Sequence, residues 1–372
     1  MNSKNRIIFV LHYSDEEHHP LWDQITTCAD GWMELDAEEM IQTGQYIPEL
    51  NVRSLPLESK PLPSIKRWWK LGNGKLLEKR EMESYSSLDV FIKSPYQWVL
   101  KYKAKLKEGS YTALPTGNLL KGSLIHRLIE DFFAENKKWI TMTDKDILQW
   151  LSKRVPLLLE QEGALLLVPG QNVEKETFIE TSKRAMLALV SSLKGSGINK
   201  IDVESFGKCN FVGGEIGGFI DMLLTDKTKR EIVLDVKWGK AKYRAKNLRD
   251  NMQLQLATYA FIRKKMTKSA TWPPQAFFVI ENAQILAQTK NAFPSAILCS
   301  SDNGETTKDL WSRVEETWKW RRNQMNKGMI EVTIEGAEPD DASVLTENCL
   351  LLEDHYNNFN DFAILTGWGE GT

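Results

Sequence analysis

The sequence predicts an α/β fold in which a mixed central β-sheet is flanked by helices, with additional helical segments. Apolar runs of strand length, bounded by polar residues, occur near Ile201, Phe219, Glu231 and Gln275. Elsewhere apolar residues recur at the three- and four-residue spacing of an amphipathic helix, most clearly over residues 119–136. We therefore expect the four strands to share one sheet, with helices packed on it.

The composition narrows the class of protein. Of the 372 residues, 42% are hydrophobic and 26% are charged, as in soluble globular proteins, and the length suffices for one to three domains. The formal net charge is −2, so any surface that binds nucleic acid must be a local basic patch. No apolar run has the length of a membrane span, and the N-terminal run is too short for a signal peptide. We expect a cytoplasmic protein without a membrane partner.

Residues 1–80 are expected to form a small α/β appendage and connector. Arg6–His12 is an apolar run that fits a buried strand, and the proline- and lysine-rich stretch over residues 50–70 indicates extended chain. Within it, Lys66–Lys70 interleaves cations with two tryptophans, a pattern that can stack bases and pair phosphates. The alternative, which we favour, is that the tryptophans anchor the connector to the core.

Residues 81–372 are expected to form the second domain, with a helical insertion at about residues 140–195. Helical spacing over the insertion predicts two helices, broken near Pro156 and again near Gly170. A strand over residues 201–212 then leads into the most informative stretch of the chain.

That stretch is a predicted β-hairpin. The apolar runs Phe219–Leu224 and Glu231–Lys237 are joined by the polar residues TDKTKR, which are typical of a turn. If the turn is centred at Thr228, residues equidistant from it face each other, so that Leu224 lies opposite Ile232.

The same register gathers charged side chains on one face. Asp221 lies opposite Asp235, with Cβ atoms about 5 Å apart, and the two-residue period of a strand places Lys237 beside Asp235. Two opposed carboxylates repel each other, so folding alone does not favour this pairing. A divalent cation would favour it, and oxygen ligands with few soft neighbours indicate Mg²⁺ or Mn²⁺.

Basic residues follow the hairpin directly. Five cations lie within ten residues: Lys240, Lys242, Arg244, Lys246 and Arg249. A charge run is usually a solvated face, but its position beside the acidic patch favours contact with phosphates. Residues 247–265 are expected to form a helix whose apolar stripe includes Gln255 and Tyr259. A glutamine on such a stripe suggests a polar partner.

Together these residues resemble a known nuclease family. Asp221 followed by Asp235-x-Lys237 matches the PD-(D/E)xK nuclease signature, and the string GGFIDML…IVLDVKWG is similar to the RecB/AddB-type branch of that superfamily. An upstream GSLIHRLIE and a downstream Gln-x-x-x-Tyr match two further motifs of the branch. A lone DxK is weak evidence for this family, but four motifs in the right order over about 140 residues are specific evidence. The resemblance extends from about residue 84 to the C-terminus.

The resemblance implies a restriction-endonuclease-like core and Mg²⁺- or Mn²⁺-dependent hydrolysis of phosphodiester bonds in DNA, by an exonuclease rather than an endonuclease. The implied metal ligands are His126, Asp221, Asp235 and the backbone carbonyl of Val236. Lys237 would orient or deprotonate the attacking water and stabilise charge on the phosphate. Gln255 and Tyr259 would contact the DNA or hold the Lys237 strand in place.

Two further carboxylates lie near the implied ligands. Glu130 follows His126 by one helical turn and could orient the imidazole from behind, although we do not favour that role. Glu204 could approach the metal from the strand before the hairpin, but we favour a solvated edge position for it.

The resemblance also implies a role and a partner. RecB-type enzymes process DNA ends with a helicase, in repair, recombination or defence against foreign DNA. The chain has no GxxxxGK[ST] loop, so an ATP-driven motor would be another chain.

Some RecB-type nucleases hold an iron–sulfur cluster, which we do not expect here. The four cysteines are far apart and form no CxxC pair. Where the first cluster cysteine would stand, before Pro95, this chain has Ser94.

Two other classes of function remain open. The chain could be a non-catalytic DNA-binding or scaffold subunit of a helicase–nuclease complex, although the intact Asp221, Asp235 and Lys237 argue against it. It could also be an unrelated hydrolase that uses the carboxylates on a small molecule, although the adjacent basic residues argue weakly against that.

Overall fold

The structure is a computed structural model that describes residues 26–28, 31, 66–106, 117–332, 348–350, 362 and 365. Contacts divide the chain into two units, Met1–Pro61 and Leu62–Thr372. In the first unit Thr26 and Thr27 are helical. The strand expected at Arg6–His12 lies outside the described residues. No helix in the described ranges combines the length and apolarity needed to cross a membrane.

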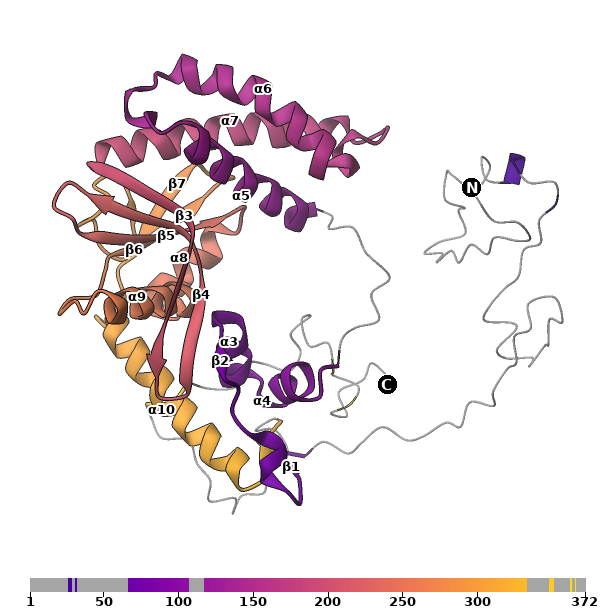
Figure 1. Cartoon of the computed structure of the whole chain (residues 1–372), viewed down its shortest axis with the longest axis vertical. Helices are drawn as coiled ribbons and strands as arrows, with labels where there is room; N and C mark the ends of the chain where they lie inside the picture. Colours follow the sequence, from indigo (N-terminus) through magenta and orange to yellow (C-terminus); the bar gives the residue numbers. More distant parts are fainter. Residues whose placement is uncertain are drawn as a thin grey trace. The chain divides into compact units, whose positions relative to one another are not determined.

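The second unit is built on a mixed sheet, as the sequence predicts (Figure 1). Among the described residues its strands are β2 (Met82–Glu83), β3 (Ile198–Phe211), β4 (Gly214–Asp226), β5 (Glu231–Lys237), β6 (Gln275–Val279), β7 (Gln284–Ala287) and β8 (Ile297–Leu298). The order is β2-β4-β5-β6-β7-β8, with β3 paired to β4. The pairs β3–β4, β4–β5 and β6–β7 are antiparallel, whereas β2–β4, β5–β6 and β7–β8 are parallel.

Helices cover both faces of this sheet. One cluster of buried side chains joins the sheet to α5 (Gly117–Glu135), α6 (Asp144–Glu162) and α7 (Asn172–Gly195). The other joins it to α3 (Tyr85–Lys93), α4 (Pro95–Trp98), α9 (Leu254–Met266) and α10 (Thr307–Asn326). Neighbouring residues of β5 alternate between the clusters, with Ile232 and Leu234 in the first and Val233 in the second. This alternation is the two-residue period of a strand buried on both faces.

The helical insertion holds α6 and α7, but the predicted break at Pro156 is wrong. The α6 helix runs through this proline. Pro156 lies on the exposed side, while Val155, Leu158 and Leu159 are buried next to it. Burial of these apolar side chains outweighs the one backbone hydrogen bond that a proline removes.

The helix predicted over residues 247–265 is in fact two helices, α8 (Ala241–Arg249) and α9. Between them Asn251 adopts a φ of +52°, in the left-handed region that ends a helix. Its fully buried side chain donates a hydrogen bond to the carbonyl of Thr306 at 3.0 Å. The tertiary partner of Asn251 therefore overrides the continuous apolar spacing.

The β3–β4 ribbon turns over between the two helical layers. Ile220 packs in the cluster of α9 and α10, whereas Met222, two residues later, packs in the cluster of α5 and α7. A regular strand keeps residues i and i+2 on one face, so the ribbon changes its orientation between them. At this point the register places Glu204 of β3 opposite Asp221 of β4. The φ of Glu204 is +49°, a conformation that non-glycine residues rarely adopt.

The second unit begins earlier than the expected boundary at residue 81, because β1 (Trp68–Lys70) pairs with β9 (Met329–Glu331). The Trp68 ring lies 6.1 Å from that of Trp320, and the Trp69 ring 5.9 Å from that of Tyr96, between centroids. These contacts support the anchoring interpretation of Lys66–Lys70.

A buried ion pair fastens this end of the unit. Arg321 on α10 is 1% exposed, donates to Glu331 at 2.7 Å and donates to the carbonyl of Ile92 at 2.6 Å. Glu331 also accepts a hydrogen bond from Arg67 at 3.0 Å. One carboxylate thus ties together β1, β9 and α10.

Replacing Glu331 with alanine is expected to destabilise the fold strongly, because it leaves a buried guanidinium without its counter-charge. We expect a loss of about 3–5 kcal/mol in the free energy of unfolding, measured by urea denaturation. Glu180→Ala, which removes the partner of Lys183 in an exposed pair at 2.7 Å, is the control and should cost less than about 1 kcal/mol. Equal losses in the two variants would contradict the role given to Glu331.

Candidate active site

The α5 helix holds His126 against the central strand β5. The buried stripe of α5, which includes Ile125 and Ile129, packs in the core with α6 and α7. His126 lies beside this stripe, with its side chain 30% exposed. Its Nε2 is 3.1 Å from the backbone carbonyl oxygen of Val236 on β5. The structure thus brings together the histidine and the carbonyl that the sequence paired as ligands.

Asp221 contacts the same residue from β4. The β4–β5 ladder has Leu224 opposite Ile232, which confirms the predicted register, and one continuation of it places Asp221 opposite Asp235. Where the backbone ladder ends, the amide of Val236 donates instead to Asp221 Oδ2, at 2.8 Å. The N–H of Val236 is therefore held by Asp221, and its C=O faces His126.

Asp235 and Lys237 form the other half of the site. Asp235 is fully buried, and Lys237 Nζ lies 2.6 Å from its Oδ2 in an ion pair. Even so, neither carboxylate oxygen of Asp235 accepts a hydrogen bond of good geometry. A buried carboxylate without hydrogen bonds is costly. Such a group is what a cation-binding site would retain.

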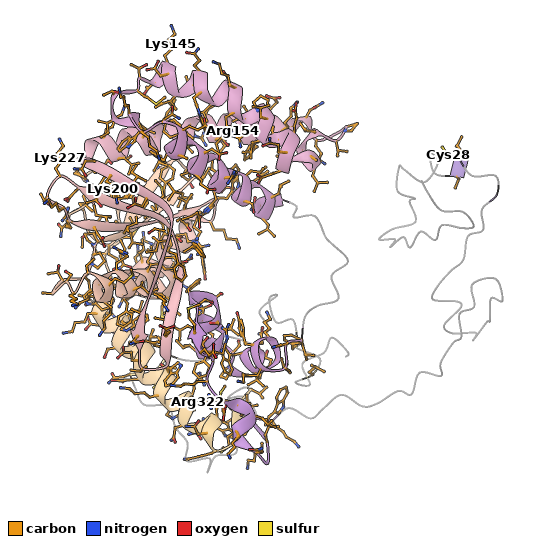
Figure 2. All side chains as sticks on the ribbon, viewed as in Figure 1. Cys28, Lys145, Arg154, Lys200, Lys227 and Arg322 are labelled. Carbon is orange, nitrogen blue, oxygen red and sulfur yellow. The ribbon has the colours of Figure 1, made fainter. Side chains whose placement is uncertain are left out.

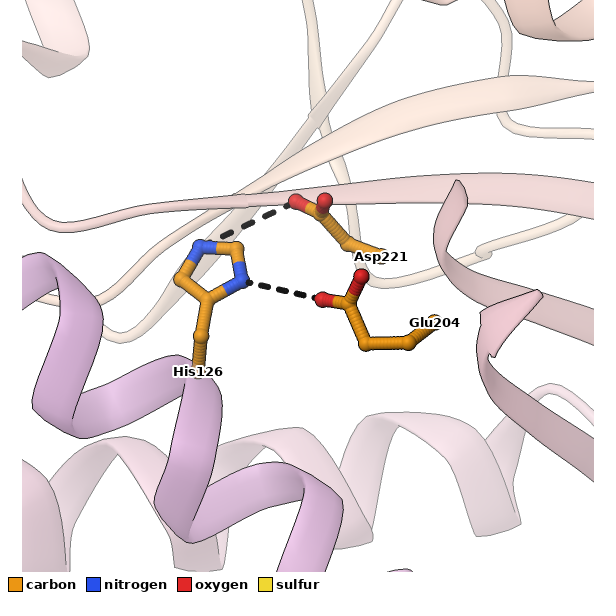
Figure 3. A group of neighbouring side chains, drawn as sticks. All are labelled: His126, Glu204 and Asp221. Carbon is orange, nitrogen blue, oxygen red and sulfur yellow. Dashed lines mark ion pairs between the residues drawn. The ribbon is translucent and has the colours of Figure 1, made fainter. Parts of the chain in front are cut away.

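Glu204 completes the group: it is exposed on β3, as expected, and its carboxylate also faces His126. Figure 3 shows the imidazole of His126 between two carboxylates, with one ring nitrogen facing each. Nδ1 is 3.8 Å from Glu204 Oε1, and Nε2 is 3.8 Å from Asp221 Oδ2. One potential ligand atom from each of the three residues lies within 4.8 Å of the others.

The sequence held a signal for Glu204 that composition and periodicity did not reveal. Val212 and Gly213 form the turn between β3 and β4, and Phe211 pairs with Gly214. Counting back from this turn places Glu204 opposite Asp221. Glu130, the other carboxylate considered for orienting His126, accepts a hydrogen bond from Arg127 at 2.8 Å. The carboxylate that faces Nδ1 is that of Glu204.

The clustered acids change the proton affinity of the site. Burial, followed by the charge of Asp235, raises the pKa of Asp221 from 3.8 to about 7, although His126, Lys237 and the Val236 amide oppose the shift. Burial lowers the pKa of His126, but its contact with Glu204 and the charge of Asp221 outweigh this and raise the pKa overall. Without a metal, the protein therefore favours the protonated forms of Asp221 and His126.

These residues fit a divalent cation. An imidazole nitrogen, carboxylate oxygens and a backbone carbonyl are ligands found for such ions, and the oxygen-rich set favours Mg²⁺ or Mn²⁺ over softer metals. A positive charge would relieve the repulsion that raises the pKa of Asp221. The possible ligand atoms that lie within 4.8 Å of one another come from His126, Glu204 and Asp221, and this group does not include Asp235.

Gln255 and Tyr259 lie on α9, on the other side of β4. Gln255 Nε2 is 3.4 Å from the Tyr259 hydroxyl. Tyr259 is 7% exposed, and a Cβ on Gly218 would stand 3.2 Å from its ring. This close approach requires a small residue on β4. The resemblance implied two roles for Gln255 and Tyr259, contact with DNA or support of a strand. The packing of Tyr259 against β4 favours support of a strand.

The basic segment is the helix α8, and its residues are not equivalent. Lys242 is exposed, and Lys240 precedes the helix with a φ of +66°. Arg244 turns inward, with its guanidinium 5.2 Å from the Tyr243 ring and 5.7 Å from the Phe277 ring. Phe277 is paired with Asp235 in the β5–β6 ladder. Arg244 is therefore the basic side chain that leans toward the site.

Comparison with protein families gives one match over most of this region. A family model described as the PD-(D/E)XK nuclease superfamily matches residues 83–336, which include β3 to β9 and the whole candidate site. Comparison with curated proteins gave no match.

The raised pKa of Asp221 predicts how stability depends on pH. In the unfolded chain this carboxyl ionises near pH 3.8, but in the fold near 7, so metal-free stability falls as pH rises from 4 to 7. Asp221→Asn removes that cost. We expect it to raise the free energy of unfolding at pH 8, by up to about 4 kcal/mol, with little effect at pH 4.

The measurement is denaturant unfolding in a chelator at both pH values. Asp202→Asn, which alters an exposed partner of Lys200 on β3, serves as the control and should change little. Adding Mg²⁺ or Mn²⁺ should stabilise the unmodified protein more than the Asp221 variant. A variant that is less stable than the parent at pH 8 without metal would refute this account.

Proposed function

Because the chain belongs to the PD-(D/E)XK nuclease superfamily, we propose that it is a Mg²⁺- or Mn²⁺-dependent deoxyribonuclease. The observation that carries this proposal is the convergence of His126, Asp221 and Glu204 on one point beside the Val236 carbonyl. The buried Asp235–Lys237 pair lies on the adjoining strand. Acidic ligands next to a lysine are the combination that phosphodiester hydrolysis needs.

In this proposal the ligands are His126, Asp221, Asp235 and the carbonyl of Val236, and Glu204 either joins them or orients His126 through Nδ1. A bound divalent cation would lower the pKa of a water molecule and offset charge on the phosphate. The protein's part is to hold the ligands in place before substrate arrives. The contacts of Val236 with Asp221 and His126 serve that purpose.

Lys237 has a separate task. Its Nζ is held by Asp235 and its side chain is 20% exposed, so the ammonium is fixed yet accessible. From there it would orient or deprotonate the attacking water and stabilise charge that develops on the phosphate. Because a fixed donor loses little entropy in the transition state, its effect falls on the rate more than on binding.

The DNA substrate is proposed from the basic helix α8 next to the site. The exposed cations on it would contact phosphates, which carry most of the affinity for nucleic acid. Given the resemblance to RecB-type enzymes, we propose that the protein processes DNA ends as an exonuclease, with a helicase on another chain. The roles in repair, recombination or defence are part of the same proposal.

Cleavage of end-labelled linear and covalently closed DNA with Mg²⁺ tests the proposed activity. Metal-dependent loss of label from linear DNA alone is expected for an exonuclease, whereas cutting of closed circles indicates an endonuclease. If neither substrate is cleaved, with or without a helicase partner, the scaffold interpretation replaces the enzyme.

Two substitutions should distinguish the contribution of the metal to cleavage from that of Lys237. Asp221→Asn and Lys237→Ala are each expected to reduce the cleavage rate at least about 100-fold, because each interaction acts mainly in the transition state. Excess metal should partly restore the Asp221 variant, which binds the ion more weakly, but not the Lys237 variant. Lys227→Ala, at the exposed β4–β5 turn (Figure 2), is the control. Rescue of both variants by metal would contradict the separate role of Lys237.

Charge reversal on α8 tests the DNA surface. The double change Lys240→Glu and Lys242→Glu should weaken DNA binding for all sequences alike and flatten its dependence on salt. The matched control reverses Lys145, labelled in Figure 2, and Lys153; both are exposed on α6 in the helical insertion. Arg244 is left in place, since a carboxylate there would enter the core. If both pairs change the salt slope equally, α8 has no special role.

A further inference from the structure

Two exposed phenylalanines lie next to the candidate active site. Phe206 on β3 and Phe219 on β4 are 46% and 56% exposed, unlike the buried aromatic side chains of the core. They are direct partners in the β3–β4 ladder, and their ring centroids are 5.1 Å apart. The rings are tilted by 53° and so do not cover each other's faces. Single exposed apolar residues are common, but an exposed pair in contact calls for a partner.

The register places this pair beside the site. Phe206 follows Glu204 by two residues and Phe219 precedes Asp221 by two, so the pair lies one step along the ribbon from the point where it turns over. The opposite face is covered there, because a Cβ on Gly207 would meet Ile262 of α9. The phenylalanines therefore point away from α9.

The spacing fits a nucleic-acid strand. Two residues along a β-strand span about 7 Å, which equals about two stacked-nucleotide rises of 3.4 Å. A phosphate at the site would thus have a neighbouring base within reach of the rings. Aromatic side chains bind unpaired bases by stacking on their faces, which are inaccessible while the base is paired within a duplex.

We infer that Phe206 and Phe219 form a stacking platform for an unpaired nucleobase within about three nucleotides of the cleaved phosphate. The platform deepens the proposed nuclease function, on which it rests, by selecting single-stranded over duplex substrate. It requires no base-specific hydrogen bond, so any sequence is accepted. The phenylalanines act on substrate position, and the chemistry stays with the metal ligands and Lys237.

The test measures binding rather than cleavage, so that its failure and that of the proposed function can be told apart. Fluorescent single-stranded oligonucleotides, each with one abasic residue at a successive position, are titrated with Asp221→Asn protein in a chelator. With both phenylalanines present, one or two abasic positions should weaken binding roughly tenfold, as loss of one stacked base predicts. The remaining positions should have little effect.

Variants assign that effect to the platform. Phe206→Leu with Phe219→Leu keeps apolar side chains on the ribbon but removes the rings. It should bind the intact strand as weakly as the abasic one and give a flat profile, with duplex binding unchanged. Phe206→Trp with Phe219→Trp should restore the profile. Leu157→Ala, which shortens an exposed side chain on α6, is the control.

Three results would overturn the inference. They are an abasic profile that persists in the leucine variant, a profile that is already flat with both phenylalanines present, and equal losses for single-stranded and duplex DNA. A flat profile together with a lower melting temperature of the leucine variant would show that the pair is covered by protein. If the tryptophan variant folds but fails to restore the profile, stacking is also refuted. An RNA series run in parallel shows whether the sugar matters.

Discussion

The candidate site depends on the point at which the β3–β4 ribbon turns over between its two helical layers. Ile220 and Met222 are two residues apart yet pack on opposite sides of the sheet. Glu204 and Asp221 lie opposite each other at that point, and the side chains of both therefore belong to neither apolar cluster. A strand buried evenly on both faces would have pointed Asp221 into packed apolar side chains. The left-handed backbone of Glu204 is the local cost of this geometry, of the order of 1–3 kcal/mol.

Electrostatics add to that local cost. The charge of Asp235 helps to raise the pKa of Asp221, and Asp235 is buried with Lys237 as its ionic partner. Such an arrangement lowers the stability of the metal-free fold. A bound cation would relieve the repulsion, so the same arrangement favours cation binding. The large apolar clusters on both sides of the sheet compensate for the loss. The site therefore depends on stability that the rest of the same sheet provides.

Much of this could be predicted because it follows from local rules. The hairpin register follows from one polar turn, and the strand period places Lys237 beside Asp235. His126 was singled out by the family resemblance and not by the helix period. What could not be predicted depends on tertiary contacts. Continuous apolar spacing concealed the break at Asn251, whose buried side chain bonds to a residue far along the chain. Pro156 signalled a break that the neighbouring core packing prevents. The approach of Glu204 to His126 was not favoured, because a turnover of the ribbon leaves no mark in hydrophobic periodicity.

One feature of β5 links the site to the sheet itself. The amide and the carbonyl of Val236 are the groups that Asp221 and His126 contact, and neither can be altered by changing a side chain. The Val236 side chain meanwhile lies in the core, 1% exposed. The site therefore cannot loosen while β5 stays in register, nor can β5 slip while the site stays assembled. Hydrogen exchange at the Val236 amide consequently reports, at a single position, on the opening of both.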